Sequence, residues 1–295
     1  MTPPGLLRSV LLAAVLLLAA LASPPRADAQ VTGEVVVSDT LLEVRLADGS
    51  VLYGRVIAVD GDRITLETQA GARVELQRAQ IRSLRPVPGR VVNGEVWLED
   101  PHATRLFFGP TARPLGAGRA YVGVYELIFP FVTYGVTSTF SISGGTPIVP
   151  EAAGEVFYFA PKLTVVQTEQ VDGAIGVLVG AAKGSTAGIV YGVGTVGDRD
   201  RALTGGIGWG FSDGDLQNQS VVMLGGELRA GPRLKLLSES YFLPGEEGAI
   251  VSVGVRFFSE NLSADLGGAR YVGSDCSDVC WFPLVNFVYS FGGGK

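Results

Sequence analysis

Charged residues of both signs in the second half of this 295-residue chain are the side chains whose types and spacing could do chemistry. Most alternate with apolar residues, and because a β-strand has a period of two, alternate residues share one face. Mixed charges on one face are more typical of an ion-pair network or a pore lining than of an active site. We therefore interpret eight residues as lumen-lining candidates and none as catalytic: Lys162, Glu227, Arg229, Arg233, Lys235, Glu239, Arg256 and Asp265.

Acid–base catalysis would have to rely on carboxylates, because His102 is the only histidine. It precedes the region of regular strands, so we expect it near the mouth of that region and not in the Ser–His pair of a lipid hydrolase. Glu227, Glu239 and Asp265 are candidates for an alternative, an enzyme that modifies lipid or glycan. Two carboxylates that converge in a cleft without arginine partners would favour this alternative.

Two further motifs could hold a cofactor or a metal. Gly192, Gly194 and Gly197 satisfy G-x-G-x-x-G, but a dinucleotide site also needs a helix after the glycines, and here a charged turn and another strand follow. Cys276 and Cys280 form a C-x3-C pair, which an oxidising export compartment would favour as a disulfide. A metal site would need more ligands, and no histidine is near the pair. We expect no cofactor.

The elements that would position these residues follow one repeat from about residue 120 to 291. It consists of roughly ten residues with an apolar side chain at every second position, and then a turn, which is the pattern of a transmembrane β-barrel. In residues 221–230, Val222, Leu224 and Leu228 share one parity, whereas Glu227 and Arg229 share the other. A soluble β-sandwich also alternates, but its strands are shorter and its outward faces are polar.

Turn lengths predict the size of the barrel. Short and long turns mostly alternate from residue 137 onward, and the strands between them number about twelve, which places both chain ends on the periplasmic side. The last strand ends in Phe291, which resembles the signal that barrel-assembly machinery reads. About twelve strands enclose a lumen that long side chains can largely close. We expect residues 106–114 to fold inward as a partial plug.

The first 29 residues are predicted to be a cleaved secretory leader. Arg8 precedes an apolar stretch, and Ala27-Asp28-Ala29 offers a cleavage motif. No later stretch holds 18 consecutive apolar residues, although the mean hydropathy is +0.32. The net charge of −6 argues against nucleic acid as a partner, since phosphate binding needs a basic surface.

A small β-rich unit precedes the barrel. Short alternating runs between residues 41 and 85 are separated by turns such as Asp60-Gly61, the strongest short-range hairpin signal. The unit resembles SH3-like or Sm-like barrels in size and hairpin rhythm, and we expect a periplasmic interaction or spacer module. Two prolines and a glycine between residues 85 and 89 should break any strand and form a linker.

One segment carries a resemblance to a known family. Asp100-Pro101, Thr104-Arg105, Phe108, Pro110-Thr111 and a later Tyr134-Gly135-Val136-Thr137 turn are the matching residues. In these motifs the chain resembles an uncharacterised family of outer-membrane β-barrels of Bacteroidota-like bacteria, over about residues 97–291. The resemblance implies a barrel and no particular activity.

The sequence thus predicts an all-β protein, a roughly twelve-stranded antiparallel transmembrane β-barrel preceded by a small SH3-like or Sm-like domain. Its segments would be 1–29 (leader), 30–40 (tail), 41–85 (small domain), 86–118 (linker and pre-barrel segment), 119–291 (barrel) and 292–295 (tail). We expect a non-enzymatic outer-membrane protein, either a narrow channel or a loop-presenting barrel. Its expected partners are outer-membrane lipid, the assembly machinery and a periplasmic protein. A soluble periplasmic β-rich interaction protein is the second alternative.

Overall fold

The computed structural model describes residues 37–68, 70–148, 155–182, 184–243, 248–273 and 281–291. The predicted leader, the cysteines Cys276 and Cys280 and the C-terminal tail lie outside these residues. The chain divides into two compact units, residues 1–96 and residues 97–295. Each unit is described by itself.

The first unit is one antiparallel sheet of five strands in the order β4-β3-β2-β1-β5. Alternate residues of the central strands turn inward, and they form a core of Leu42, Val44, Val56, Ile64, Leu66, Leu76 and Ile81. Short hairpins join the first strands, and Gly61 has a φ of 58° in the predicted Asp-Gly turn. The elements are β1 (Ser38–Leu46), β2 (Val51–Asp60), β3 (Arg63–Thr68), β4 (Arg73–Gln77), the short helix η1 (Arg78–Gln80) and β5 (Ile81–Pro86).

Glu43 is the one buried carboxylate among the described residues of this unit. The register of the sheet places Tyr53 of β2 and Arg85 of β5 on either side of it. Arg85 donates to both carboxylate oxygens, with distances of 3.1 Å from Nε to Oε1 and 2.6 Å from Nη2 to Oε2. Burial alone would raise the pKa of Glu43, but hydrogen bonds from Arg85 and Tyr53 hold it below its usual value.

The expected break between the units is shorter than residues 85–89. β5 continues through Pro86, and β6 (Gly89–Val92) starts after two intervening residues and pairs with β7 (Glu95–Leu98). Pro86 is compatible with a strand because it occupies the last position of β5 at the edge of the sheet, where its missing N–H costs no ladder hydrogen bond.

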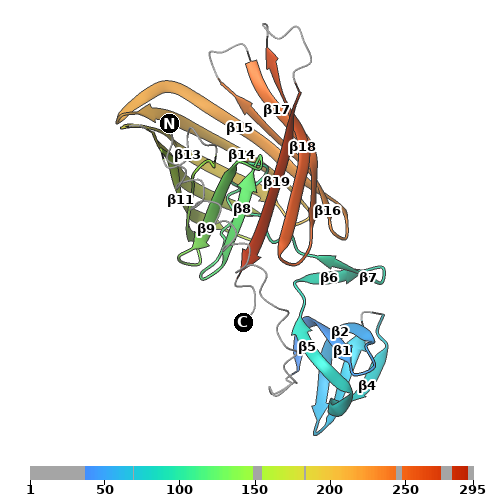
Figure 1. The fold of residues 1–295 in the computed structure, drawn as a ribbon. Coiled ribbons are helices and arrows are strands. Elements are labelled where there is room, and N and C mark those ends of the chain that lie inside the picture. Colours follow the sequence, from blue (N-terminus) through green and yellow to red (C-terminus); the bar gives the residue numbers. More distant parts are fainter. Residues whose placement is uncertain are drawn as a thin grey trace, which may run out of the picture. The chain divides into compact units, whose positions relative to one another are not determined.

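The second unit is a closed antiparallel barrel of twelve strands, which confirms the predicted fold and strand number. Each strand pairs with the next in sequence, and β19 pairs with β8 to close the barrel (Figure 1). The strands are β8 (Ala120–Tyr125), β9 (Phe129–Gly135), β10 (Phe140–Gly145), β11 (Val156–Gln167), β12 (Val171–Ala182), β13 (Ser185–Gly197), β14 (Arg201–Ser212), β15 (Asp215–Gly231), β16 (Leu234–Phe242), β17 (Gly248–Phe258), β18 (Leu262–Gly273) and β19 (Trp281–Phe291).

The two faces of the barrel strands differ as the alternation predicts. In β15, Leu224 and Leu228 are exposed on the outside, whereas Met223 and Glu227 are buried in the interior. β19 repeats the pattern, with Phe287 exposed and Asn286 buried. The barrel therefore presents an apolar outer surface and encloses a mixed polar interior.

Gly192, Gly194 and Gly197 all lie within β13, and a turn and β14 follow them. The glycine motif therefore does not begin a helix, as the sequence indicated. No helix in the described residues is long and apolar enough to cross a membrane.

Candidate functional site

Residues 99–118, called the plug below, join β7 to β8 and fill part of the barrel interior. The side chains of Leu106, Phe107 and Ala112 are fully buried. Phe107 packs in a cluster with Leu237 of the barrel wall, and Ala112 packs against other wall residues. The prediction that residues 106–114 fold inward is confirmed, and the inserted segment is longer than expected.

An arginine–aspartate pair of the wall binds the start of the plug. Arg256 Nε lies 2.6 Å from Asp265 Oδ1, and the register sets the two residues opposite each other on β17 and β18. The remaining donors of Arg256 bond to Asp100 Oδ2 at 3.2 Å and to the carbonyl oxygens of His102 and Leu106 at 3.0 and 2.6 Å. This guanidinium thus satisfies plug carbonyls that have no strand partner.

The middle of the plug is bound by a carboxylate, that of Glu239 on β16. Its Oε2 accepts the backbone N–H groups of Phe107, Phe108 and Gly109 at 2.8, 3.1 and 3.1 Å. Its Oε1 accepts the hydroxyl of Tyr241 at 2.7 Å. Three consecutive amides on one oxygen form an anion-binding turn, so the wall carboxylate fixes the shape of the plug.

A second group of charges binds the later part of the plug. Arg113 pairs with Glu227 at 2.5 Å, and Lys235 lies 3.4 Å from Glu227 and 3.2 Å from Asp100. Lys162 of β11 donates to the carbonyl oxygens of Thr111 and Arg113, at 2.7 and 2.8 Å. The plug is therefore attached to strands on several sides of the barrel.

Six of the eight lumen candidates from the sequence are buried and contact the plug or its charge network: Lys162, Glu227, Lys235, Glu239, Arg256 and Asp265.

The other two candidates lie at the β15–β16 end. Arg229 is half-buried, donates to the carbonyl oxygens of Leu98 and Pro232, and stacks on Trp97 and Phe258. Arg233 is exposed and does not line the lumen, because it lies in the turn between β15 and β16, where the alternation of the strands has ended.

Asp100, Arg105 and Arg113 were missed, although they complete the network. They belong to the plug, which contains no regular strand, so the alternation of residues along a strand cannot assign them to the lumen. The available signal was the presence of charged residues in a segment that was itself expected to enter the barrel.

His102 is fully buried, and its Nε2 lies 2.9 Å from Ser290 Oγ, one residue before the end of β19. It therefore contacts a serine at the end of the barrel where β19 terminates. Asp100 Oδ1 accepts the backbone N–H of His102, and Nδ1 has no partner among the described residues, whereas a triad needs an acceptor there. Burial and the nearby Arg105 guanidinium lower the pKa of His102 to about 3, so the ring is neutral.

A cavity of about 790 Å³ adjoins the plug inside the barrel. Its wall is mainly apolar and aromatic, and Tyr125 stacks on Phe131 with ring centroids 4.1 Å apart. Arg105 and Phe108 of the plug and Lys162 of the wall also border it. Its aromatic wall residues are Tyr121, Tyr125, Phe129, Phe131, Tyr158, Tyr191 and Tyr241.

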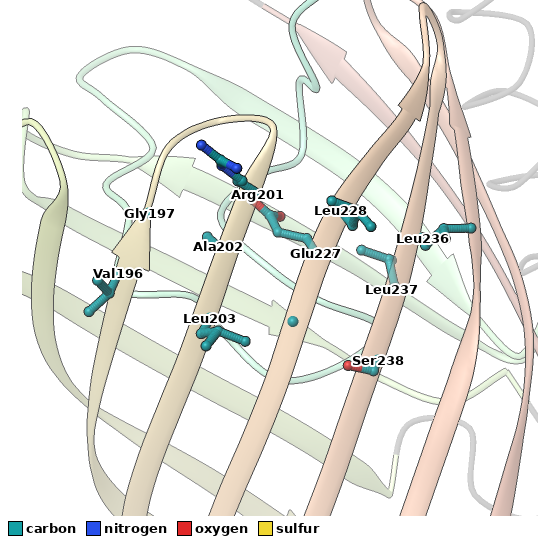
Figure 2. A pocket seen from close by; sticks show the side chains of 11 residues that line it. Val196, Gly197, Arg201, Ala202, Leu203, Glu227, Leu228, Leu236, Leu237 and Ser238 are labelled. Carbon is teal, nitrogen blue, oxygen red and sulfur yellow. The ribbon is translucent and has the colours of Figure 1, made fainter.

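A second hollow of about 540 Å³ lies over β13–β16. Figure 2 shows Arg201 beside the β13–β14 turn, with Leu203 further along β14, and the register places Leu228 and Leu236 level with Arg201 on β15 and β16. These three leucines are exposed on the outer surface, and Arg201 has a long ion pair of 3.9 Å with Asp198. This groove therefore belongs to the outer face and not to the lumen.

No known protein family and no curated protein matches the chain. Among solved structures, the chain is similar to a KdgM porin, with 9% identity, a TM-score of 0.45 and coverage of 59% of this chain and 98% of that one. The same porin in complex with disordered oligogalacturonate gives 8% identity, a TM-score of 0.46 and the same coverage. OmpT of Vibrio cholerae, lacking loop L8, gives 12% identity, a TM-score of 0.34 and coverage of 85% and 96%.

Proposed function

We propose that this chain is an outer-membrane β-barrel whose lumen is a chamber for a small, largely apolar solute, with the plug as the closed gate beneath it. The observation that carries the proposal is an aromatic-lined cavity of about 790 Å³ bordered by a plug with buried ionic attachments. Binding sites for small molecules commonly have volumes of about 300–1,000 Å³ and mostly apolar walls.

The outer surface supports a membrane location. Large apolar side chains are exposed around the barrel, for example Phe159, Leu203 and Phe287. Burial of one such side chain contributes about 1.5–3 kcal/mol, so a continuous exposed band would be unstable in water. The small β-domain, which has its own core, would then be a periplasmic interaction module.

The carboxylates support a non-enzymatic function. Glu227 and Asp265 are each paired with arginine, and Glu239 is engaged by backbone amides and Tyr241. The arrangement that would favour an enzyme, two carboxylates converging without arginine partners, is not formed by these three residues. Their role in the proposal is to hold the plug in the closed position.

Planar-bilayer recordings test the chamber and its gate. We expect the intact protein to conduct little, because the plug occupies the lumen. Deletion of residues 105–114 should produce stepwise conductance, and Glu239→Gln should give intermittent openings, because a neutral amide binds the three plug amides more weakly.

An intact protein with large, stable conductance steps would contradict the closed plug. A deletion variant that inserts into the bilayer but carries no current would contradict a lumen that runs through the barrel. Asp215→Asn, on an exposed position of β15, is the control for insertion efficiency.

A further inference from the structure

The plug places an incompletely bonded guanidinium at the wall of the chamber. Arg105 is 2% exposed, and its Nη1 donates to the carbonyl oxygens of Leu106 and Phe107 and to Asp265. Its Nε and Nη2 have no hydrogen-bond partner among the described residues, and both nitrogens are enclosed, so a ligand reaches them only when the side chain shifts toward the chamber. These two nitrogens form the edge of the guanidinium that binds a carboxylate through two parallel hydrogen bonds.

A second cation at the chamber wall has no carboxylate within ion-pair distance among the described residues, and Asp172 is its nearest electrostatic partner. Lys162 is 7% exposed, and within the described residues its ammonium bonds only to the carbonyl oxygens of Thr111 and Arg113. An ammonium has three N–H donors, so one remains for a ligand. Arg105 and Lys162 both line the cavity.

The buried charges of the described barrel and plug are five cations and four carboxylates, and the half-buried Asp172 adds a negative charge that acts on Arg113 and Lys162. An anionic ligand in direct contact with Lys162 would compensate its charge more fully than Asp172 does, because Coulomb energy falls with distance. The cations are Arg105, Arg113, Lys162, Lys235 and Arg256, and the carboxylates are Asp100, Glu227, Glu239 and Asp265.

The rest of the wall restricts the ligand further. The stacked rings of Tyr125 and Phe131, together with Tyr158, give the wall an aromatic surface against which an apolar or aromatic body can pack. Glu126 also borders the cavity and is partly exposed, and its Oε1 accepts the backbone N–H of Val285 at 3.2 Å. Its carboxylate would repel a second negative charge on the ligand.

From the incompletely hydrogen-bonded Arg105, the spare donor of Lys162 and the aromatic wall, we propose that the chamber binds an organic monocarboxylate with an apolar or aromatic body. The carboxylate would accept hydrogen bonds from Arg105 Nε and Nη2 and from Lys162, and the body would lie against the tyrosine and phenylalanine rings. The inference rests on the proposed chamber function and names its ligand class.

Binding to the full chain in lipid nanodiscs tests the proposal. The probes are 4-phenylbutanoate, its alcohol 4-phenylbutanol and its amine 4-phenylbutylamine, measured by calorimetry against empty nanodiscs. We expect the carboxylate to bind at least about tenfold more tightly than the alcohol, since charge-assisted bidentate bonds are worth more than neutral ones. The amine should bind most weakly.

Variants locate the binding. Arg105→Lys keeps the charge but removes the two-nitrogen edge, and Lys162→Met removes the ammonium, so each should weaken carboxylate binding about tenfold and leave alcohol binding unchanged. Leu178→Trp, which fills the chamber, should weaken binding of both probes. Arg201→Gln on the outer groove is the matched control and should change neither.

Equal binding of carboxylate and alcohol, both lost in Leu178→Trp, would overturn the anion site and leave the chamber standing. No binding of any probe to the wild type would overturn both proposals. Preferential carboxylate binding that survives Arg105→Lys and Lys162→Met would overturn the assignment to these residues. The comparison of probes on the wild type needs no variant, so it holds even if a variant fails to fold.

Discussion

Asp265 pairs with two buried guanidinium groups, one from the barrel wall and one from the plug. It accepts hydrogen bonds from Arg256 at 2.6 Å and from Arg105 at 2.7 Å, and it is fully buried. Removal of its charge would take away the ion-pair partner of Arg105 and leave Arg256 with Asp100 alone.

We expect Asp265→Asn to lower the free energy of unfolding by about 3–5 kcal/mol, the usual cost of breaking a buried pair from one side. Urea titration of the barrel in lipid vesicles measures it. Asp215→Asn, at an exposed position, should change the value by less than about 0.5 kcal/mol. Equal midpoints for the two variants would refute the role of the pair.

His102 gives the barrel a pH dependence at mildly acidic pH. Because burial lowers its pKa from 6.5 to about 3, the folded state excludes a proton that the unfolded state takes up. The stability that this neutral ring contributes is complete above pH 6.5 and is lost as the pH falls toward 3. The loss is about 1.4 kcal/mol per pH unit.

His102→Gln should remove this slope. Arg256 and Lys235 hold the pKa of Asp100 below 3.8 despite its burial. Protonation of this carboxylate therefore changes the stability only at more acidic pH, and it does so in the wild type and in the variant alike. The difference in unfolding free energy between wild type and variant, measured from pH 6.5 to 4.5, isolates His102. Parallel curves across this range would contradict the assignment.

At the scale of elements, β15 and the plug fit together because two glycines lack side chains. A Cβ on Gly225 would lie 2.3 Å from Leu106 Cδ1 and 2.8 Å from the carbonyl oxygen of Ser238. A Cβ on Gly109 would lie 2.4 Å from Met223 Sδ. The wall and the plug therefore approach each other so closely that a methyl group added at either glycine would force the wall or the plug to move.

Gly225→Ala should loosen the plug without preventing barrel formation. We expect faster proteolysis within residues 105–114 and a loss of about 1–3 kcal/mol in unfolding free energy, as for overpacked cores. Gly180→Ala is the matched control, because a Cβ there meets its nearest atom at 3.6 Å, an ordinary contact. The same proteolysis rate in both variants would show that the fit at Gly225 does not restrain the plug.

At the scale of the whole molecule, the closed barrel and the exposed apolar band imply a protein that behaves as an outer-membrane barrel. We expect the expressed chain to fractionate with outer membrane and to migrate faster on gels before heating than after. Closure by β19 and β8 is internal to residues 97–295, so a chain without residues 30–96 should show the same heat-modifiable migration. Recovery of the leader-cleaved chain in the soluble periplasm would refute the membrane location.

The sequence by itself determined the strands, their faces and their number. The period of two is a local property, so Leu224 and Glu227 of one strand could be assigned to opposite faces without knowledge of any neighbour. Turn residues are local as well, and they marked where each strand ends. The same locality explains the error at Arg233. Its assignment to the lumen extended the alternation of β15 beyond Gly231, where the strand ends and a turn begins.

Only the tertiary structure decided which charges meet and what they enclose. Arg105 and Asp265 are 160 positions apart, and Arg113 and Glu227 are 114 apart, so no spacing rule connects them. The plug has no period, because its backbone groups bond to wall side chains instead of to a strand. Its path, the buried Ser290–His102 contact and the chamber beside Arg105 and Lys162 follow from the closure of the barrel around it.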